Sequence, residues 1–186
     1  GEIKAYPVVE MEFHPEANQV EYVLCPAIIS EKIANKAKQV ALKASTAFNH
    51  VGILAVELFL THDDEILINE VAPRPHNSGH QTIETSYTSQ FEQHLRAILG
   101  MPLGSTENKL SGVMVNLVGA ENHKGEVVYE NIEKIMEMGG VTPHIYGKTE
   151  TRPFRKMGHV TVVHSNIESA RAIAEEVKKS IKVISK

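Results

Sequence analysis

The stretch that decides the fold runs over residues 56–80 and reads VELFLTHDDEILINEVAPRPHNSGH. Two apolar runs rich in Leu, Ile and Phe flank the polar pair Asp63-Asp64, a pattern typical of two antiparallel strands joined by a tight turn. A two-residue loop at that pair predicts which residues face each other across the strands: His62 and Glu65, Leu60 and Leu67, and Glu57 and Glu70. The sequence therefore predicts a β-hairpin with two opposed carboxylates near its open end.

Glu57 and Glu70 form a candidate metal site in this hairpin. Directly opposed residues share one face of a sheet, with Cβ atoms roughly 4.5–5.5 Å apart. Two like charges in such positions repel each other unless a proton or a cation lies between them. Because Mg²⁺ and Mn²⁺ prefer oxygen ligands and bridge carboxylates to nucleotide phosphates, we interpret the pair as a site for one of these ions.

Two other interpretations of the acidic pair stay open from the sequence. Acidic residues on a hairpin are commonly solvated, and a bulge at the turn would shift the register and place the carboxylates on opposite faces. The position of the pair favours a site, because Glu57 lies in the apolar run 51–60, where a charge requires a partner. Glu70 lies where a strand gives way to a loop of potential binding groups, which are Arg74, His76, Asn77 and His80.

Length and composition exclude several classes of protein. With 186 residues, 42% of them hydrophobic, the chain is long enough for one large domain or two small ones. A net charge of −4 and a pI near 6.2 argue against nucleic acid or an anionic membrane as a partner, and no apolar run approaches the roughly 20 residues of a membrane span. The single cysteine, Cys25, fits a reducing cytosol, so we expect a cytoplasmic protein. Because the chain opens in a strand pattern without an initiator Met, we expect it to be cut from a longer one.

Hydrophobic periodicity and turn residues predict a mixture of helices and strands. Before the turn-rich link 102–108 we expect strands at 3–13, 20–24, 51–60 and 65–71 and helices at 31–48 and 81–99. Ser30 and Asn49 supply the N-cap and the C-terminal stop of the first helix. After the link we expect strands at 111–118, 141–146, 159–164 and 181–184, a partly helical segment at 127–138 and a helix at 168–179. The elements lack the regular spacing of βαβ units, so we predict the α+β class.

A second polar cluster lies in the segment 146–159, which Gly and Pro mark as a loop between strands. Its four cations fall within nine residues and are Lys148, Arg152, Arg155 and Lys156. Lys and Arg side chains on such a loop suit an anionic head group such as a phosphate ester, which Arg binds through two parallel hydrogen bonds. The alternative is a solvated basic surface loop, and the cluster is too short for a nucleic-acid groove.

Several motifs together resemble a known enzyme family. They lie at residues 6–10, 69–80, 89–97 and 152–159. In this order along the chain they resemble the N5-carboxyaminoimidazole ribonucleotide synthases. This family is also called the PurK family, or the ATPase subunit of phosphoribosylaminoimidazole carboxylase, and it belongs to the ATP-grasp superfamily. The resemblance implies the C-terminal lobe of an ATP-grasp domain, an antiparallel sheet with helices, over residues 1–103. It implies a small α/β C-terminal domain with a ribonucleotide phosphate-binding loop over residues 104–186.

The resemblance also implies a reaction and a set of site residues. Members of the family use ATP to activate bicarbonate as carboxyphosphate, and they carboxylate 5-aminoimidazole ribonucleotide to N5-carboxyaminoimidazole ribonucleotide in purine biosynthesis. The resemblance implies that Glu57, Asn69 and Glu70 bind ATP, and that Glu57 and Glu70 hold Mg²⁺ or Mn²⁺. It implies that Arg74 is catalytic and stabilises negative charge at the bicarbonate and phosphoryl group. It further implies catalysis and aminoimidazole binding by His76 and Asn77, and binding of the ribonucleotide phosphate by Lys148 and Arg155. We expect a homodimer of the full-length protein and no nucleic-acid or membrane partner.

Two departures from the family pattern qualify these expectations. Phe154 stands where many members have Gly. The preceding lobe with the nucleotide-clamping Lys, the phosphate loop and the adenine pocket has no counterpart in the sequence, so we expect that these 186 residues alone do not turn over ATP. The alternatives are another ATP-grasp ligase, such as a formate-dependent glycinamide ribonucleotide transformylase or biotin carboxylase, and a non-catalytic nucleotide- or phosphate-binding module. The loop 73–80 speaks against the first, and the joint presence of Glu57, Glu70 and Arg74 against the second.

Overall fold

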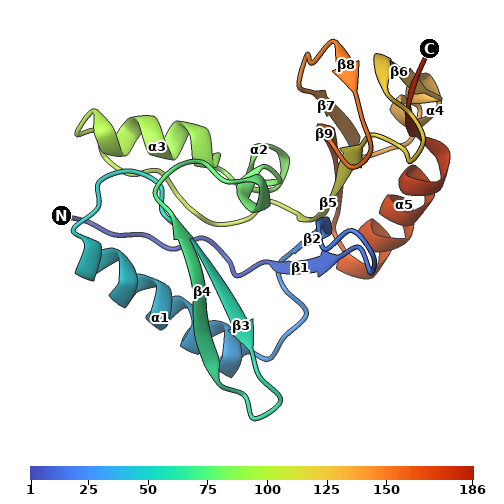
Figure 1. Cartoon of the computed structure of the whole chain (residues 1–186). Helices are drawn as coiled ribbons and strands as arrows, with labels where there is room; N and C mark the ends of the chain where they lie inside the picture. The colour runs from blue at the N-terminus through green and yellow to red at the C-terminus, as the bar shows by residue number, and fades with distance from the viewer. The chain divides into compact units, whose positions relative to one another are not determined.

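Figure 1 shows the elements of the computed structural model, which describes every residue from 1 to 186. In chain order they are β1 (Glu10–Phe13), β2 (Val20–Cys25), α1 (Glu31–Phe48), β3 (Ala55–Leu60), β4 (Ile66–Ala72), the 3-10 turn η1 (Asn77–Gly79), α2 (Thr82–Thr85), α3 (Gln90–Ile98), β5 (Ser111–Val118), β6 (Gly125–Glu130), α4 (Ile132–Met136), β7 (Val141–Ile145), β8 (Glu150–Thr151), β9 (Lys156–His164), α5 (Ile167–Ser180) and β10 (Lys182–Ser185). The pairs β3–β4, β5–β9, β7–β9, β6–β8 and β6–β10 are antiparallel. This mixture of helices and antiparallel sheets confirms the α+β class.

Helix α1 has the bounds that its sequence predicts. Ser30 is the N-cap, and its hydroxyl accepts a hydrogen bond from Ile33 N at 3.3 Å. At the other end Asn49 adopts the left-handed conformation, with φ 47°, which closes the last turn. Ile33, Ala37 and Ala44 are its buried residues, so one apolar stripe holds the helix to the rest of the unit. No helix of the chain combines the length and apolar character that a membrane span requires.

The single helix expected over 81–99 is two helices, α2 and α3. Between them Ser86 is extended, with φ −103° and ψ 159°, and forms an isolated antiparallel bridge with Asn108. The Ser86 hydroxyl also donates to Asn108 Oδ1 at 3.1 Å. Ser89 then starts α3 as an N-cap that accepts from Glu92 N at 3.2 Å. A partner 22 residues away in the chain therefore breaks a helix that local periodicity favours.

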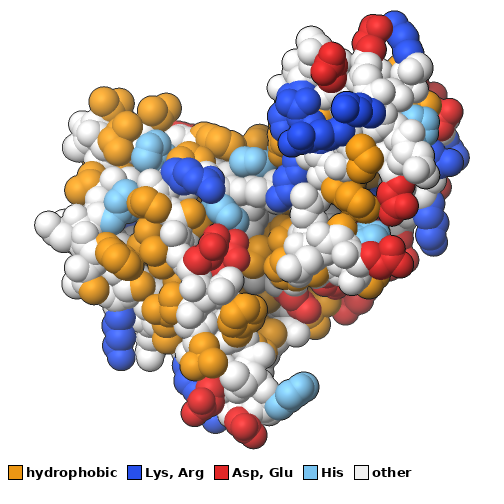
Figure 2. Space-filling view, viewed as in Figure 1, with side chains coloured by type: hydrophobic (Ala, Val, Ile, Leu, Met, Phe, Trp, Pro, Cys, Tyr) orange, Lys and Arg blue, Asp and Glu red, His pale blue; other side chains and the backbone are white.

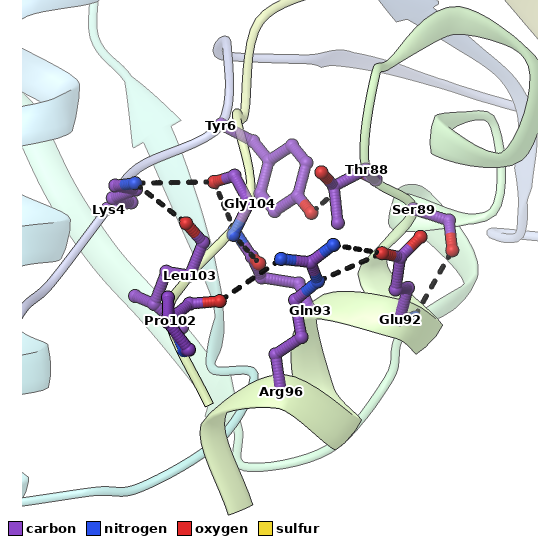
Figure 3. Close-up of polar contacts among 10 residues, drawn as sticks. All are labelled: Lys4, Tyr6, Thr88, Ser89, Glu92, Gln93, Arg96, Pro102, Leu103 and Gly104. Carbon is purple, nitrogen blue, oxygen red and sulfur yellow. Dashed lines mark hydrogen bonds and ion pairs between the residues drawn. The ribbon is translucent and has the colours of Figure 1, made fainter. Parts of the chain in front are cut away.

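The predicted first strand, 3–13, is a strand only at Glu10–Phe13. The preceding residues are held by single contacts with the region around α3 instead of by a sheet ladder (Figure 3). Lys4 Nζ donates to Leu103 O at 3.0 Å, and the Tyr6 hydroxyl donates to Thr88 O at 2.8 Å. Burial raises the pKa of the Tyr6 hydroxyl, which keeps it a hydrogen-bond donor. The opening segment is thus hydrogen-bonded to the residues on both sides of α3.

A five-stranded sheet, in the order β1-β2-β5-β9-β7, carries the main apolar core. Strands β5 and β9 lie at its centre and pair from Ser111 with His164 onward. Helix α5 contributes buried small residues to this core. The fully buried residues shared by these elements include Val113, Val115, Val160, Val162, Ala170, Ala174 and Val177. Six consecutive residues of β5 and six of β9 are buried, so these two strands are covered on both faces.

The segment 127–138 is helical only at Ile132–Met136. Its first part belongs to β6, where Val128 faces Ile184 of β10. Asn131 ends the strand in a left-handed conformation, with φ 64°. The β-branched and aromatic residues of β6 favour a strand once β10, more than 50 residues later in the sequence, supplies an edge.

The chain forms two compact units. One consists of Gly1–Glu10 and Cys25–Lys109, and the other of Met11–Leu24 and Leu110–Lys186. The segment Met11–Leu24 therefore joins the sheet of the second unit, where β2 lies beside β5. The division into residues 1–103 and 104–186 did not anticipate this exchange. As a division of function it stays a prediction.

Candidate functional site

The turn of the β3–β4 hairpin is longer than predicted. It is a three-residue loop, 62–64, closed by a hydrogen bond from Thr61 N to Glu65 O at 2.9 Å. Asp64, the last loop residue, is left-handed with φ 59°, as is common for three-residue hairpin loops. Two predicted pairs near the turn are consequently wrong, namely His62 with Glu65 and Leu60 with Leu67.

A bulge in β4 restores the predicted register at the open end of the hairpin. The pairs on the turn side are Leu60 with Ile66, Phe59 with Leu67 and Leu58 with Ile68. Asn69 is then an extra residue without a partner in β3, and beyond it Glu57 faces Glu70. One extra residue in the turn and one in the strand cancel each other. The predicted opposition of the two carboxylates is confirmed.

Glu57, Glu70 and His76 form a three-residue cluster at the open end of the hairpin. One ligand atom of each lies within 4.8 Å of those of the other two. Glu70 is exposed, whereas the Glu57 side chain is 20% exposed and His76 is 15% exposed. Asn69 Nδ2 lies 3.5 Å from Glu57 Oε2, at the limit of a hydrogen bond. The carboxylate oxygens of Glu57 and Glu70 have the donor type and spacing of a divalent-cation site, and the His76 imidazole lies beside them.

The His76 ring is oriented by groups at both of its nitrogens. Nδ1 accepts from Ser78 N at 3.4 Å and lies 2.9 Å from Ser78 Oγ. Nε2 lies 3.4 Å from Glu57 Oε1. The Ser78 N–H that points at Nδ1 favours the tautomer with the proton on Nε2, facing Glu57. Ser78 was not a predicted site residue, although its place between Asn77 and Gly79 put it inside the motif.

The other predicted residues of this loop lie near the cluster in sequence but do not join it. The Arg74 guanidinium donates to the carbonyl of the adjacent Pro75 at 3.0 Å and is exposed. Asn77 starts the 3-10 turn η1, and its carbonyl accepts from His80 N at 3.1 Å. Figure 2 shows acidic, His and Lys or Arg side chains side by side over the end of the β3–β4 ribbon remote from its turn.

The predicted basic loop lies in the second unit, between β7 and β9. Lys148 Nζ donates to Lys156 O at 2.5 Å and lies 5.9 Å from the centre of the Tyr146 ring. Arg155 Nη1 donates to Glu150 O at 2.9 Å. Phe154 is left-handed with φ 59°, the conformation that a Gly adopts without strain. Figure 2 shows Lys and Arg side chains gathered over the part of this unit that carries β8.

Comparison with known proteins places these two regions in a family. Residues 1–91 match the ATP-grasp domain, and residues 112–173 match the phosphoribosylaminoimidazole carboxylase C-terminal domain. The N5-carboxyaminoimidazole ribonucleotide synthase of Bacillus subtilis is 47% identical over 161 residues, which are 87% of this chain and 40% of the relative. The chain belongs to the N5-carboxyaminoimidazole ribonucleotide synthase family. The resemblance inferred from the sequence is thereby confirmed.

Solved structures of the family agree with this assignment. The N5-carboxyaminoimidazole ribonucleotide synthetase of Thermotoga maritima has a TM-score of 0.92 and 49% identity, and the match covers 100% of this chain and 49% of that one. The N5-carboxyaminoimidazole synthase of Aspergillus clavatus, in complex with ADP and 5-aminoimidazole ribonucleotide, has a TM-score of 0.83 and 35% identity over 94% of this chain and 46% of that one. The chain thus spans about half the length of the family members that it matches.

Proposed function

We propose that this chain supplies the metal-binding and phosphate-binding groups of an ATP-dependent carboxylase. The reaction converts 5-aminoimidazole ribonucleotide, bicarbonate and ATP into N5-carboxyaminoimidazole ribonucleotide in purine biosynthesis. The observation that carries the proposal is the direct opposition of Glu57 and Glu70 beside His76. Membership of the N5-carboxyaminoimidazole ribonucleotide synthase family supports the choice of substrates.

Glu57 and Glu70 fit a magnesium or manganese ion that holds the phosphates of ATP. Their carboxylate oxygens are the ligands that these ions prefer, and without a cation the two charges repel each other. The ion, when bound, neutralises charge on the phosphates and on the transferred phosphoryl group. Asn69 orients Glu57 through its amide and contacts the nucleotide. Glu70 is exposed, so a nucleotide can reach this carboxylate from solvent.

The loop after β4 serves the bicarbonate and the aminoimidazole. Arg74 carries a permanent positive charge that is held only by its own backbone, so it can turn toward the bicarbonate and stabilise the charge on carboxyphosphate. His76 and Asn77 line the aminoimidazole pocket. With its proton on Nε2, His76 presents a donor on the same side as the carboxylates, where it can hydrogen-bond the reacting groups.

The basic loop of the second unit binds the ribonucleotide phosphate in this proposal. Lys148 and Arg155 donate to carbonyl groups of their own loop, and a phosphate oxygen is a stronger acceptor for both cations. We therefore propose residues 1–103 as the nucleotide and bicarbonate lobe and residues 104–186 as the phosphate-binding domain. We further propose a cytoplasmic homodimer for the full-length protein, which sedimentation at several concentrations would test.

A chimeric enzyme tests the proposed function. This chain would replace the matching segment of the Bacillus subtilis relative, and phosphate release would be measured with and without 5-aminoimidazole ribonucleotide. We expect substrate-dependent release that falls at least about 100-fold in Glu57→Gln or Glu70→Gln, because each removes a charge from the metal site. Glu107→Gln, an exposed acid of the same unit, serves as the control. Release that does not respond to the ribonucleotide would favour another ATP-grasp ligase, and no release at all would favour the non-catalytic binding module. From the 186 residues alone we expect no ATP turnover above background.

A further inference from the structure

Gln90, the first residue of α3, clamps the backbone of His76. Its amide oxygen accepts from His76 N at 2.9 Å, and its amide nitrogen donates to His76 O at 2.8 Å. The same nitrogen lies 2.8 Å from His80 Nδ1. Gln90 is only 3% exposed, so these bonds form away from competing water. A buried amide thus satisfies both backbone groups of a single residue in the loop.

The surrounding residues are shaped to admit this amide. A Cβ atom at Gly79 would lie 2.5 Å from Gln90 Oε1, so the Gln90 amide would have to move to admit it. Gln90 N donates to Thr82 Oγ1 at 2.9 Å, and the same hydroxyl donates to Gly79 O at 2.6 Å. Gly79 therefore leaves the space that the Gln90 amide occupies, and Thr82 hydrogen-bonds to both segments.

The clamp determines where the His76 ring can point. With its N–H and C=O both fixed, His76 can change only its side-chain torsions. The ring then meets Ser78 at Nδ1 and Glu57 at Nε2. A residue with a free backbone at this place would sample other loop conformations, and the population with the ring beside Glu57 would fall.

We propose that Gln90 is a positioning residue that holds His76 in register with the carboxylates of Glu57 and Glu70. Gln90 hydrogen-bonds to neither carboxylate and acts through the backbone of His76. The proposal rests on the proposed function, in that the register matters because the two carboxylates bind a divalent ion. The geometry of the clamp is nevertheless open to a test that needs no ion.

Gln93, one turn further along α3, provides a matched control. It is 4% exposed and makes the same two-point contact with another backbone, that of Gly104. Its amide nitrogen donates to Gly104 O at 3.0 Å, and its amide oxygen accepts from Gly104 N at 2.8 Å (Figure 3). Loss of either glutamine removes a two-point contact between α3 and a backbone segment. Only Gln90 contacts the loop of the site, where its loss also removes the contact with His80 Nδ1.

The test compares Gln90→Leu with Gln93→Leu in the 186-residue chain. Nitrogen-15 NMR at one fixed pH reads which ring nitrogen of His76 carries the proton, and electron paramagnetic resonance reads the affinity for Mn²⁺. In Gln90→Leu we expect the signals of His76 to move toward an average of the two tautomers, and the Mn²⁺ affinity to fall about tenfold. In Gln93→Leu we expect faster hydrogen exchange at the Gly104 amide, with the His76 signals and the Mn²⁺ affinity unchanged.

The outcomes separate this proposal from the proposed function. If Gln90→Leu keeps the tautomer of His76, or if Gln93→Leu changes it equally, Gln90 only stabilises α3 and the proposal is wrong. If the unsubstituted chain binds no Mn²⁺, the metal site fails, and the tautomer of His76 still decides the role of Gln90. Should Gln90→Leu fail to fold, Gln90→Glu replaces it. An ionised Glu accepts from His76 N but cannot donate to His76 O, so we expect a smaller change in the same direction.

Discussion

Neutralising Glu70 should stabilise the chain without metal and destabilise it with metal. In the metal-free chain the carboxylates of Glu57 and Glu70 lie within 4.8 Å of each other. Glu70→Gln preserves the size of the side chain and removes one of the two charges. The repulsion is then lost, while the weak contact between Asn69 and Glu57 is retained.

The size of the effect follows from Coulomb's law. At about 4.8 Å two unit charges repel by about 1 kcal/mol in water and by about 3 kcal/mol at an effective dielectric constant of 20. Because Glu70 is exposed, the lower figure applies. A gain of about 1 kcal/mol raises the melting temperature of a cooperatively unfolding chain of 186 residues by roughly 2–4 °C. Mn²⁺ at about ten times its dissociation constant should stabilise the unsubstituted chain by about 1.4 kcal/mol. In Mn²⁺ the unsubstituted chain should therefore melt above Glu70→Gln.

Thermal unfolding followed by circular dichroism measures both effects. The unsubstituted chain, Glu70→Gln and the control Glu107→Gln would be melted in EDTA and in Mn²⁺. We expect Glu70→Gln to melt above the unsubstituted chain in EDTA and below it in Mn²⁺, and Glu107→Gln to follow the unsubstituted chain in both. A melting temperature of Glu70→Gln that does not rise in EDTA would refute the claim that two uncompensated charges face each other.

Two further predictions concern the turn and the cysteine. Asp64→Gly should raise the free energy of unfolding by about 0.5–1 kcal/mol, because Gly adopts the left-handed conformation of Asp64 without strain. Urea unfolding measures this free energy. The control is Asp63→Gly, at a position without positive φ, which should not stabilise the chain. Burial raises the pKa of the Cys25 thiol to about 11, so the folded chain keeps the proton that the unfolded chain loses near pH 8.5. The stability from this shift is fully present below about pH 8.5 and is lost as the pH rises through 11. Urea unfolding should therefore show a steeper loss between those pH values than in Cys25→Ala, and equal slopes would contradict the prediction.

The elements that the sequence predicts well are those whose signals are local. Helix α1 carries its own N-cap and stop at Ser30 and Asn49, and both act within one turn. The single helix over 81–99 was wrong because Ser86 bridges to Asn108, a partner that is distant in the sequence. The partly helical segment 127–138 is confirmed by α4, but the strand β6 in its first part was not predicted, because its partner β10 is distant in the sequence and gives no local signal.

The candidate site shows the same division. The pairing of Glu57 with Glu70 was predicted, but from a turn that is one residue too short, and Asn69 compensates for it. Nothing in the local pattern indicates such a bulge. The clamp by Gln90 was missed as well, since its bonds join residues 14 positions apart. The available signal was a pair of glutamines, Gln90 and Gln93, at buried positions of an amphipathic helix.

The exchange of Met11–Leu24 between the units governs how the chain can be divided. A truncation that starts at residue 104 would remove β2 from its place beside β5. The backbone donors and acceptors of a central strand would then face solvent, which invites edge-to-edge aggregation. No single cut in the chain therefore separates the two units. To produce the second unit by itself, residues 11–24 have to be fused to residues 110–186 through a new linker.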